Sequence, residues 1–562
     1  MTAFSKKYWR RFSLKEKAIL LVLASITLIA SILLVTNVSK KYIKAIPTVG
    51  GVMTVGIVGQ PYILNPILTQ ANETDVDLEA LIYNGLFNYG NQGELIPSLA
   101  QKYEVSDDGK TYTVILGKNI LWQDGTDFTA DDVIFTVESI QDPDYHSPWK
   151  DNWLGVVAEK VNSNVVAFHL NKPYVGFKDN LTVKIIPAHI WGEVNVKNLS
   201  LAKYSLQPVG TGPYVFSKLT KDKLGNIISY DLKANDHYFE NLPNISTIVY
   251  RFYKNYDELN DAFQKKEVSS LTNVPYYLKE GLKNRSNYLK TIELPRYYSV
   301  FYNLNSTNPL LSSADNRLAL NLAIDRENIN QTVFDGKLLP TNNLISQSFL
   351  GFNAAPETVL TYNPTQSQEI LGKTFHLNSS SIWEKIIKQK SQPTTYEPVT
   401  LKLTVADLPE LKSSANLIKA NWDKAGIPTE LQIVSLNELE SDIIPNKKYE
   451  VLLFGEFYGQ EPDPYNFWHT GGSLNLSNFS DTTVDALLEE IQQINDQDKR
   501  QEDLVELQNI LLEKSPCFTL GNPLQFYALS PNIKGDILTK GNYLSDRYNN
   551  VSNWYINTRL SR

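Results

Sequence analysis

Short runs of alternating hydrophobic and polar residues recur along the chain and predict both strands and helices. Residues 111–116 (TYTVIL) alternate with the period of two expected of a strand, although both faces are partly apolar. The preceding residues Asp107–Lys110 include a glycine, which tolerates the positive φ of a tight hairpin turn. Thr129 is placed to cap a helix whose first turn carries Asp131 and Asp132. The pattern therefore predicts a strand, a turn and a capped helix.

The same kind of pattern predicts further elements. Residues 53–58 and 450–454 are short apolar runs that predict strands. Apolar residues at helical spacing predict helices over Asp75–Leu86 and over Ala314–Val333. Residues 375–398 are rich in Ser, Lys and Gln, and we expect a surface insertion with one helix there.

The first forty residues carry the pattern of a membrane anchor. Residues 18–39 contain no charged residue, and as a helix they would span about 33 Å, close to the ~30 Å hydrocarbon core of a bilayer. Six basic residues precede this run, so the positive-inside rule places residues 1–17 in the cytoplasm. A cleaved signal peptide is the alternative, but its apolar region is usually only about 7–15 residues long. We therefore predict an uncleaved single-pass anchor in the cell membrane, a tether over 40–51, and the remaining chain on the outer face.

Length, charge and cysteine content narrow the class of protein. The 562 residues suggest more than one lobe or domain. The net charge of −8, with no basic stripe beyond the N-terminus, argues against a nucleic-acid partner. Cys517 is the single cysteine, so no internal disulfide forms.

Sequence signatures of catalysis are missing. The chain has no HExxH motif or close histidine pair for zinc, and no G-x-S-x-G nucleophile elbow. The carboxylate pairs at 107–108 and 131–132 fit a turn and a helix cap. We therefore predict a protein that is not an enzyme and requires no metal or organic cofactor. A glycosidase with two carboxylates far apart in the sequence is the remaining enzymatic alternative.

Several motifs occur in an order that identifies a family resemblance. Residues 82–138 (IYNGLFNYGNQGELIPSLAQKYEVSDDGKTYTVILGKNILWQDGTDFTADDVIFTVE), 207–214 (QPVGTGPY), 316–326 (NRLALNLAIDR) and 450–468 (EVLLFGEFYGQEPDPYNFW) follow one another. This order resembles solute-binding protein family 5, the dipeptide- and oligopeptide-binding components of ABC importers. The resemblance implies the two-lobed α/β fold of periplasmic binding proteins, in the large class II variant that binds peptides. It implies lobe I over 52–295 with a subdomain over about 75–205, lobe II over 296–517, and a return to lobe I over 518–562.

The resemblance also places a ligand cleft beside residues 460–468. In peptide-binding relatives an aspartate early in this loop pairs with the ligand's α-ammonium, whereas an ungapped alignment puts Gln460 there. A neutral amide does not replace a carboxylate as counter-ion, and Glu461, one residue along, could take the role after a small backbone shift. Turn formation is an equal alternative for the Asp463–Asn466 segment. The candidate ligand-binding residues are Tyr62, Asn65, Tyr297, Tyr302, Asn303, Gln460, Glu461, Asp463, Tyr465, Asn466 and Trp468.

The expected function is that of an extracytoplasmic, membrane-anchored receptor of an ABC importer. We expect it to bind peptides as a monomer, to close about a hinge near 295–300 and 515–520, and to present its lobes to the permease subunits. A non-peptide ligand such as a nickel chelate, a sugar or an opine-like compound is one alternative. A sensor or adhesin that keeps the fold but has lost transport is another.

Overall fold

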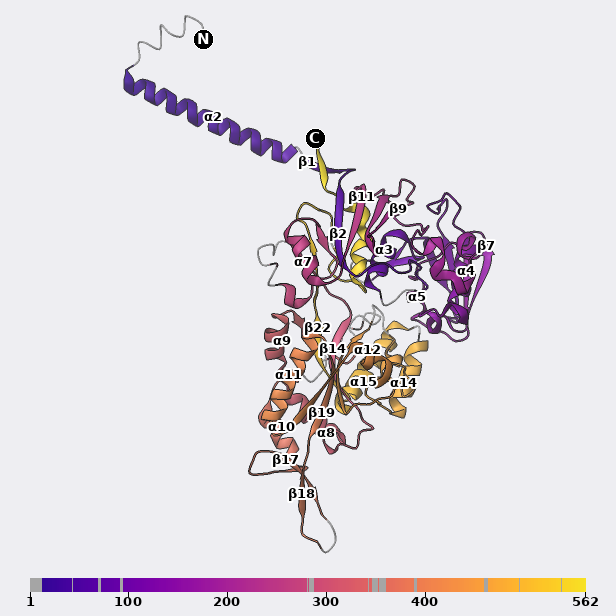
Figure 1. The fold of residues 1–562 in the computed structure, drawn as a ribbon, viewed down its shortest axis with the longest axis vertical. Coiled ribbons are helices and arrows are strands. Elements are labelled where there is room, and N and C mark those ends of the chain that lie inside the picture. The colour runs from indigo at the N-terminus through magenta and orange to yellow at the C-terminus, as the bar shows by residue number, and fades with distance from the viewer. Residues whose placement is uncertain are drawn as a thin grey trace, which may run out of the picture.

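In the computed structural model, two α/β lobes follow one another along the long axis (Figure 1). It describes residues 13–561 apart from 43, 69–71, 91–93, 280–281, 283–287, 342, 346–351, 353–359, 389–391, 459–462, 495 and 537, and it leaves out the side chains of 14, 20–21, 32–42, 44–45 and 559–561. Each lobe is built around its own sheet and its own apolar core.

Lobe I is organised by a seven-stranded sheet with the order β13-β23-β12-β2-β11-β10-β9. Its strands are β2 (Val52–Val58), β9 (Tyr214–Lys221), β10 (Ile227–Ala234), β11 (Thr247–Tyr253), β12 (Ser270–Leu271), β13 (Leu289–Ile292) and β23 (Gln525–Leu529). The apolar run predicted at 53–58 is β2, which pairs in parallel with β11 and β12. Helices α3 (Glu73–Ile82) and α7 (Tyr256–Gln264) belong to this lobe, and α3 ends four residues before the predicted Leu86.

A subdomain with a four-stranded antiparallel sheet, β5-β6-β8-β7, is part of the core of lobe I. Its elements are β5 (Ala100–Val105), β6 (Thr111–Leu116), β7 (Val156–Asn162), β8 (Val165–Leu170), α4 (Ala130–Gln141), α5 (Phe177–Asn180) and α6 (Ala188–Trp191), with the small pair β3 (Phe87–Tyr89) and β4 (Leu95–Pro97) alongside. The strand predicted at 111–116 is confirmed as β6. The predicted cap is also confirmed, because Thr129 and Asp132 form a reciprocal capping box at α4.

Lobe II is organised by a six-stranded sheet with the order β15-β22-β14-β21-β19-β20. Its strands are β14 (Arg296–Tyr302), β15 (Leu338–Leu339), β19 (Leu401–Ala406), β20 (Thr429–Val434), β21 (Val451–Phe457) and β22 (Cys517–Pro523). Its helices are α8 (Ala314–Leu322), α9 (Arg326–Phe334), α10 (Pro364–Leu371), α11 (Pro409–Lys424), α12 (Leu436–Glu438), α13 (Pro464–Trp468), α14 (Thr482–Gln493) and α15 (Gln497–Lys514). Together they enclose a core that includes Val300, Leu403 and Leu453.

Two predictions within lobe II were wrong. The single helix predicted over 314–333 is divided into α8 and α9, because Asp325 leaves the helical conformation and its side chain caps α9 by accepting from Asn328 N. The insertion at 375–398 contains no helix in its described residues and is a three-stranded sheet, β16 (Phe375–Leu377), β17 (Trp383–Ile387) and β18 (Thr395–Pro398). This sheet is held to lobe II by Trp383, whose indole Nε1 donates to the carbonyl of Ala425.

Within the described residues, the chain crosses between the lobes twice. The first crossing leads from β13 into β14, which starts at Arg296. The second comes at Leu524, between β22 and β23. The segment after β23 returns to lobe I, where Arg547 forms a buried ion pair of 2.7 Å with Asp77 of α3.

The N-terminal helix α2 (Leu14–Tyr42) extends away from the two lobes (Figure 1). It is followed by β1 (Lys44–Thr48), which pairs with β24 (Asn557–Ser561) close to the C-terminus. Within the described residues, no helix is found with the length and apolar character needed to cross a membrane. Part of the predicted anchor at 18–39 lies outside the described side chains, and the anchor stays a prediction.

Candidate functional site

The two lobes touch through side chains that flank the loop after β21. The ring of Tyr543, in the C-terminal segment of lobe I, stacks on that of Phe457 at the end of β21, with centroids 5.3 Å apart and planes inclined by 26°. The backbone N–H of Val175 in the subdomain donates to the carbonyl of Gln492 in α14 at 3.3 Å. Beside this contact, the Tyr174 hydroxyl hydrogen-bonds the carboxylate of Asp463. The candidate site is therefore the boundary between the lobes.

A second group of contacts lies near the crossings. Tyr276 of lobe I packs edge-on against Phe334 of α9, with centroids 5.3 Å apart, and its hydroxyl donates to the carbonyl of Leu524 at 2.6 Å. Lys279 forms an ion pair of 3.1 Å with Asp335. These contacts join the lobes beside the chain crossing itself, where a hinge would need least relative displacement.

The predicted loop residues take different positions. Asp463 caps α13, accepting from the N–H of Tyr465 at 2.9 Å, and its other oxygen accepts from the amide of Gln492. Burial raises the pKa of the Asp463 carboxyl, against the hydrogen bonds that lower it. Tyr465 stacks on His469 with centroids 4.0 Å apart, and Asn466 is exposed.

Trp468, Tyr302, Asn303 and Asn65 are buried within the lobes. The indole of Trp468 donates to the carbonyl of Leu344, and Tyr302 donates to the side chain of Asn321. The Asn303 amide donates to the carbonyl of Tyr449, and its oxygen accepts from Asn478. The side-chain oxygen of Asn65 accepts from the N–H of Ile67. These four side chains hold loops and strands in place.

The remaining predicted residues lie nearer the surface or are not among the described residues. Tyr62 is 67% exposed in the loop after β2, and its N–H donates to Asp75. Tyr297, at the start of β14, is half-buried and packs edge-on against Tyr458 with centroids 5.2 Å apart. Gln460 and Glu461 lie outside the described residues.

Glu456 is a buried carboxyl group near the end of β21. It lies on β21 opposite Tyr297, and one of its oxygens accepts from the hydroxyl of Tyr458 at 2.9 Å. Burial raises the pKa of Glu456 to about 8, although the hydrogen bond and the ammonium of Lys447 oppose the rise. The group is therefore mainly neutral in neutral solution and able to donate as well as accept.

A cavity of about 120 Å³ lies in lobe I next to the Tyr543–Phe457 contact. Its walls come from α3, the subdomain and the C-terminal segment. The lining residues are Pro66, Val76, Glu79, Ala80, Asn88, Tyr89, Trp149, Thr182, Val183, Lys184, Asn542, Tyr543, Ser545, Asp546 and Asn549. Sequence reasoning did not single out Lys184 or Asp546, because no motif marks them and only the fold brings them together.

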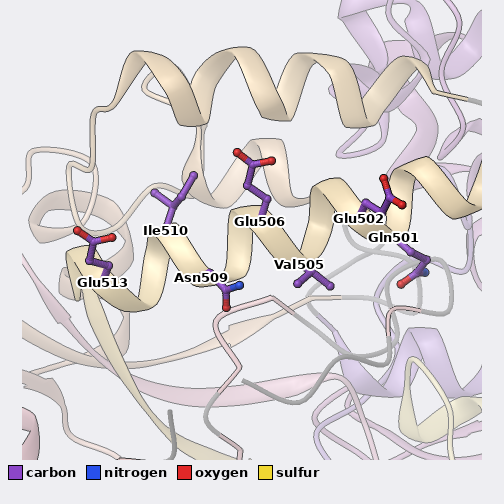
Figure 2. Close-up of a pocket in the computed structure, with 7 residues that line it drawn as sticks. All are labelled: Gln501, Glu502, Val505, Glu506, Asn509, Ile510 and Glu513. Carbon is purple, nitrogen blue, oxygen red and sulfur yellow. The ribbon is translucent and has the colours of Figure 1, made fainter. Parts of the chain in front are cut away.

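A larger hollow of about 620 Å³ runs along α15 and is shown in Figure 2. The seven lining residues, Gln501, Glu502, Val505, Glu506, Asn509, Ile510 and Glu513, all belong to that single helix. No described residue of another element lines the opposite side, so this hollow gives no basis for a site. Among the described residues, no group of three His, Cys, Asp or Glu side chains is placed to hold a metal ion.

Comparison with known proteins gives consistent matches over most of the chain. The model of bacterial extracellular solute-binding proteins, family 5 Middle, matches residues 94–478. The chain is 26% identical over 560 residues to the oligopeptide-binding protein AppA of Bacillus subtilis, covering 97% of this chain and 99% of that protein. It is 25% identical over 512 residues to a dipeptide-binding protein of Escherichia coli, covering 85% and 91%.

Solved structures share the same fold. The substrate-binding protein CtaP of Listeria monocytogenes superposes with a TM-score of 0.77 at 24% identity, covering 90% of this chain and 99% of that one. AppA of B. subtilis in complex with a nonapeptide gives 0.70 at 24%, covering 91% and 100%. NikZ of Campylobacter jejuni in complex with Ni(L-His) gives 0.72 at 21%, covering 90% and 99%. With the family match extending from the subdomain into lobe II, the chain belongs to family 5 of the bacterial extracellular solute-binding proteins.

Proposed function

We propose that the chain is the membrane-anchored, extracytoplasmic receptor of an ABC importer and that it binds peptides between its lobes. The observation that carries the proposal is the boundary between two separately cored lobes, which are joined by two chain crossings. Aromatic rings and hydrogen-bonding groups from both lobes meet there, at Tyr543, Phe457, Tyr174 and Asp463. Relatives named for oligopeptide and dipeptide binding support peptides as the ligand class.

The proposed mechanism is closure of one lobe on the other around the ligand. The lobes open without ligand, and the ligand then bridges both lobes and expels water as they close. Contacts beside the crossings, such as Tyr276 with Phe334, change little during this motion, whereas contacts at Phe457 and Asp463 form late. The closed pair of lobes is the surface that the permease subunits recognise, and no covalent bond of the ligand changes.

A non-peptide ligand is the second candidate. Gln460 occupies the position where the resemblance to peptide binders expects a carboxylate for the ligand's ammonium. Ligands without a free amine would not need that carboxylate. The fold likewise occurs in NikZ, solved with Ni(L-His), and in AgaA of A. tumefaciens, solved with agropinic acid.

Identification of the bound ligand decides between these candidates. The part of the chain from residue 44 onward is purified without added ligand, denatured, and the released small molecules are identified by mass spectrometry. Peptides in the released fraction are the expected result, and they should rebind to the refolded protein in calorimetry. Only non-peptidic material, together with no heat of binding for a mixed peptide library, would overturn the peptide assignment.

The anchor is a separate part of the proposal. Residues 18–39 are uncharged, and α2 extends away from both lobes with Ile19, Val22, Leu23, Ile26, Leu28 and Ile29 between 54% and 63% exposed. Exposed aliphatic side chains of this number are stabilised by a lipid environment. The full chain is expected in the membrane fraction after high-salt and carbonate washing, and a chain starting at residue 44 in the soluble fraction. A full chain that washes off would contradict the anchor.

A further inference from the structure

The cavity in lobe I combines three ionisable groups that lie far apart in the sequence. Glu79 comes from α3, Lys184 from the strand-like segment that bridges to Gly85, and Asp546 from the helical turns at Leu544–Asn553. Aromatic rings of Tyr89, Trp149 and Tyr543 form much of the remaining wall. The cavity adjoins the boundary between the lobes because Tyr543 also stacks on Phe457.

Lys184 contributes a half-buried ammonium group to the wall of this cavity. Within the described residues it makes no hydrogen bond or ion pair, and Glu79, Asp546 and Asp77 act on it only through longer-range attraction. Burial lowers the pKa of Lys184, and these three carboxylates oppose the decrease. An ammonium group in a cavity wall is stabilised when an oxygen atom accepts its hydrogen bonds, so an acceptor that enters the cavity finds a donor at Lys184.

Asp546 provides a hydrogen-bond acceptor in the same cavity. Its Oδ2 accepts the backbone N–H groups of Asn542 at 2.6 Å and Tyr543 at 3.1 Å. Its Oδ1 makes no hydrogen bond to any described residue, so it is left to accept from a group inside the cavity. Burial raises the pKa of this carboxyl, although the two backbone hydrogen bonds and the charges of Lys184 and Arg547 oppose the rise.

The charges around the cavity restrict what can enter it. Asp77 is paired with Arg547 at 2.7 Å, and Glu79 and Asp546 also attract the ammonium of Lys184. An ion entering between Lys184 and Asp546 is attracted by one group and repelled by the other, and it also loses its hydration. A neutral group that carries both an acceptor and a donor meets neither difficulty, because its oxygen faces Lys184 and its N–H or O–H faces Asp546.

We propose that this cavity is a subsite for an uncharged hydrogen-bonding group of the ligand, a carboxamide or a hydroxyl. The ligand oxygen accepts from Lys184 Nζ, and the ligand N–H or O–H donates to Asp546 Oδ1. A volume of about 120 Å³ equals that of roughly four water molecules in the liquid, which suits the end of a glutamine-sized side chain. The assignment to a peptide side chain rests on the proposed function, whereas the chemistry of the subsite does not.

The chemistry is tested first with small probes of equal size. Crystals of the full-length protein are soaked separately in propionamide, propionate and propylammonium at the same concentration. Propionamide is expected in the cavity, with its oxygen on Lys184, at clearly higher occupancy than either ion. A cavity that takes propionate or propylammonium more readily, or none of the three, would overturn the proposal.

The link to the ligand is tested with peptides that differ at one position. Peptides carrying Gln, norleucine, Glu or Lys are compared by calorimetry on the wild type, on Lys184→Met, and on Lys218→Met as a matched control on exposed β9. Gln should bind about tenfold more tightly than norleucine, the effect of one hydrogen bond to a charged group. Lys184→Met should abolish that preference, and Lys218→Met should preserve it.

Together, the crystal soaks and the peptide comparison distinguish failure of the subsite from failure of the proposed function. Propionamide in the cavity without binding of any peptide supports the subsite and removes the peptide assignment. If peptides bind with no preference for Gln at any position and Lys184→Met does not lower their affinity, the subsite is overturned and the proposed peptide receptor is retained. A folded Lys184→Met protein is verified by its unchanged unfolding midpoint.

Discussion

Tyr543 of lobe I stacks on Phe457 of lobe II, with ring centroids 5.3 Å apart and planes inclined by 26°. The two residues are 86 positions apart in a chain that crosses between them at Leu524. Phe457 is the last residue of β21, so the sheet of lobe II presents its ring directly toward the other lobe. Because Tyr543 also lines the cavity of lobe I, this contact links that cavity to the end of β21.

Replacing Phe457 by Ala is expected to weaken ligand binding by up to about tenfold. An aromatic pair of this kind contributes about 0.5–1.5 kcal/mol, and under the proposed mechanism it stabilises only the arrangement in which the lobes touch. Calorimetry gives the affinity, and small-angle scattering shows whether the unliganded variant is more extended. Phe216→Ala is the matched control, since its ring packs on Tyr230 within lobe I. Equal affinity of the Phe457 variant and the wild type would contradict the role of this contact.

Glu456 is expected to make the stability of lobe II depend on pH. Its pKa is about 8 in the folded chain against an ordinary value of 4.5, because burial disfavours the charged form. Between these values the unfolded chain has released the proton and the folded chain retains it, so stability falls as pH rises. The slope attributable to this group is at most about 1.4 kcal/mol per pH unit, and the loss is complete above about pH 8.

Glu456→Gln measures this contribution, because an amide keeps an oxygen for the Tyr458 hydroxyl without ionising. Urea unfolding at a series of pH values gives the free energy of unfolding of both proteins. The value for the variant should rise relative to that of the wild type from about pH 5 to pH 8. Glu430→Gln, at an exposed position of β20, is expected to follow the wild type. Parallel stability curves for Glu456→Gln and the wild type would show that Glu456 ionises normally.

Local signals explain which elements could be predicted. The helix after Thr129 was found because its cap and first-turn carboxylates are adjacent in sequence. The break between α8 and α9 was missed, although Asp325 is a good N-cap residue, because the apolar spacing continues across it. Strand β17 was missed because its conformation depends on sheet pairing and on the contact of Trp383 with Ala425, which is 42 residues away.

The candidate site was less predictable than the fold for a physical reason. A tyrosine or asparagine in a cleft and one in a core have the same local sequence signature. Tyr302 and Asn303 bond within lobe II, whereas Tyr62 is exposed, and nothing in the residue types separates them. Lys184 and Asp546 line the same cavity only because the C-terminal segment returns to lobe I, which is a property of topology.

The ion pair between Asp77 and Arg547 is expected to stabilise the packing of the C-terminal segment on lobe I. Both side chains are almost fully buried, and their nearest atoms lie 2.7 Å apart. Asp77→Asn leaves a buried guanidinium without its counter-ion and should lower the free energy of unfolding by about 3–5 kcal/mol. Combining it with Arg547→Met removes both charges, so the double variant should lose less than the sum of the two single variants. Urea unfolding of all four proteins measures the coupling, and strictly additive losses would contradict it.

The last prediction concerns Glu461, beside the position where Gln460 replaces an expected aspartate. If Glu461 serves as the counter-ion of a peptide's α-ammonium, Glu461→Gln removes a charge-assisted hydrogen bond that N-acetylated peptides never make. Free-amine peptides should then bind at least about tenfold more weakly to the variant, while acetylated peptides bind as before. Calorimetry with one peptide in both forms measures the difference. Equal weakening of both forms would assign Glu461 a structural role and leave ligand recognition to groups other than a free amine.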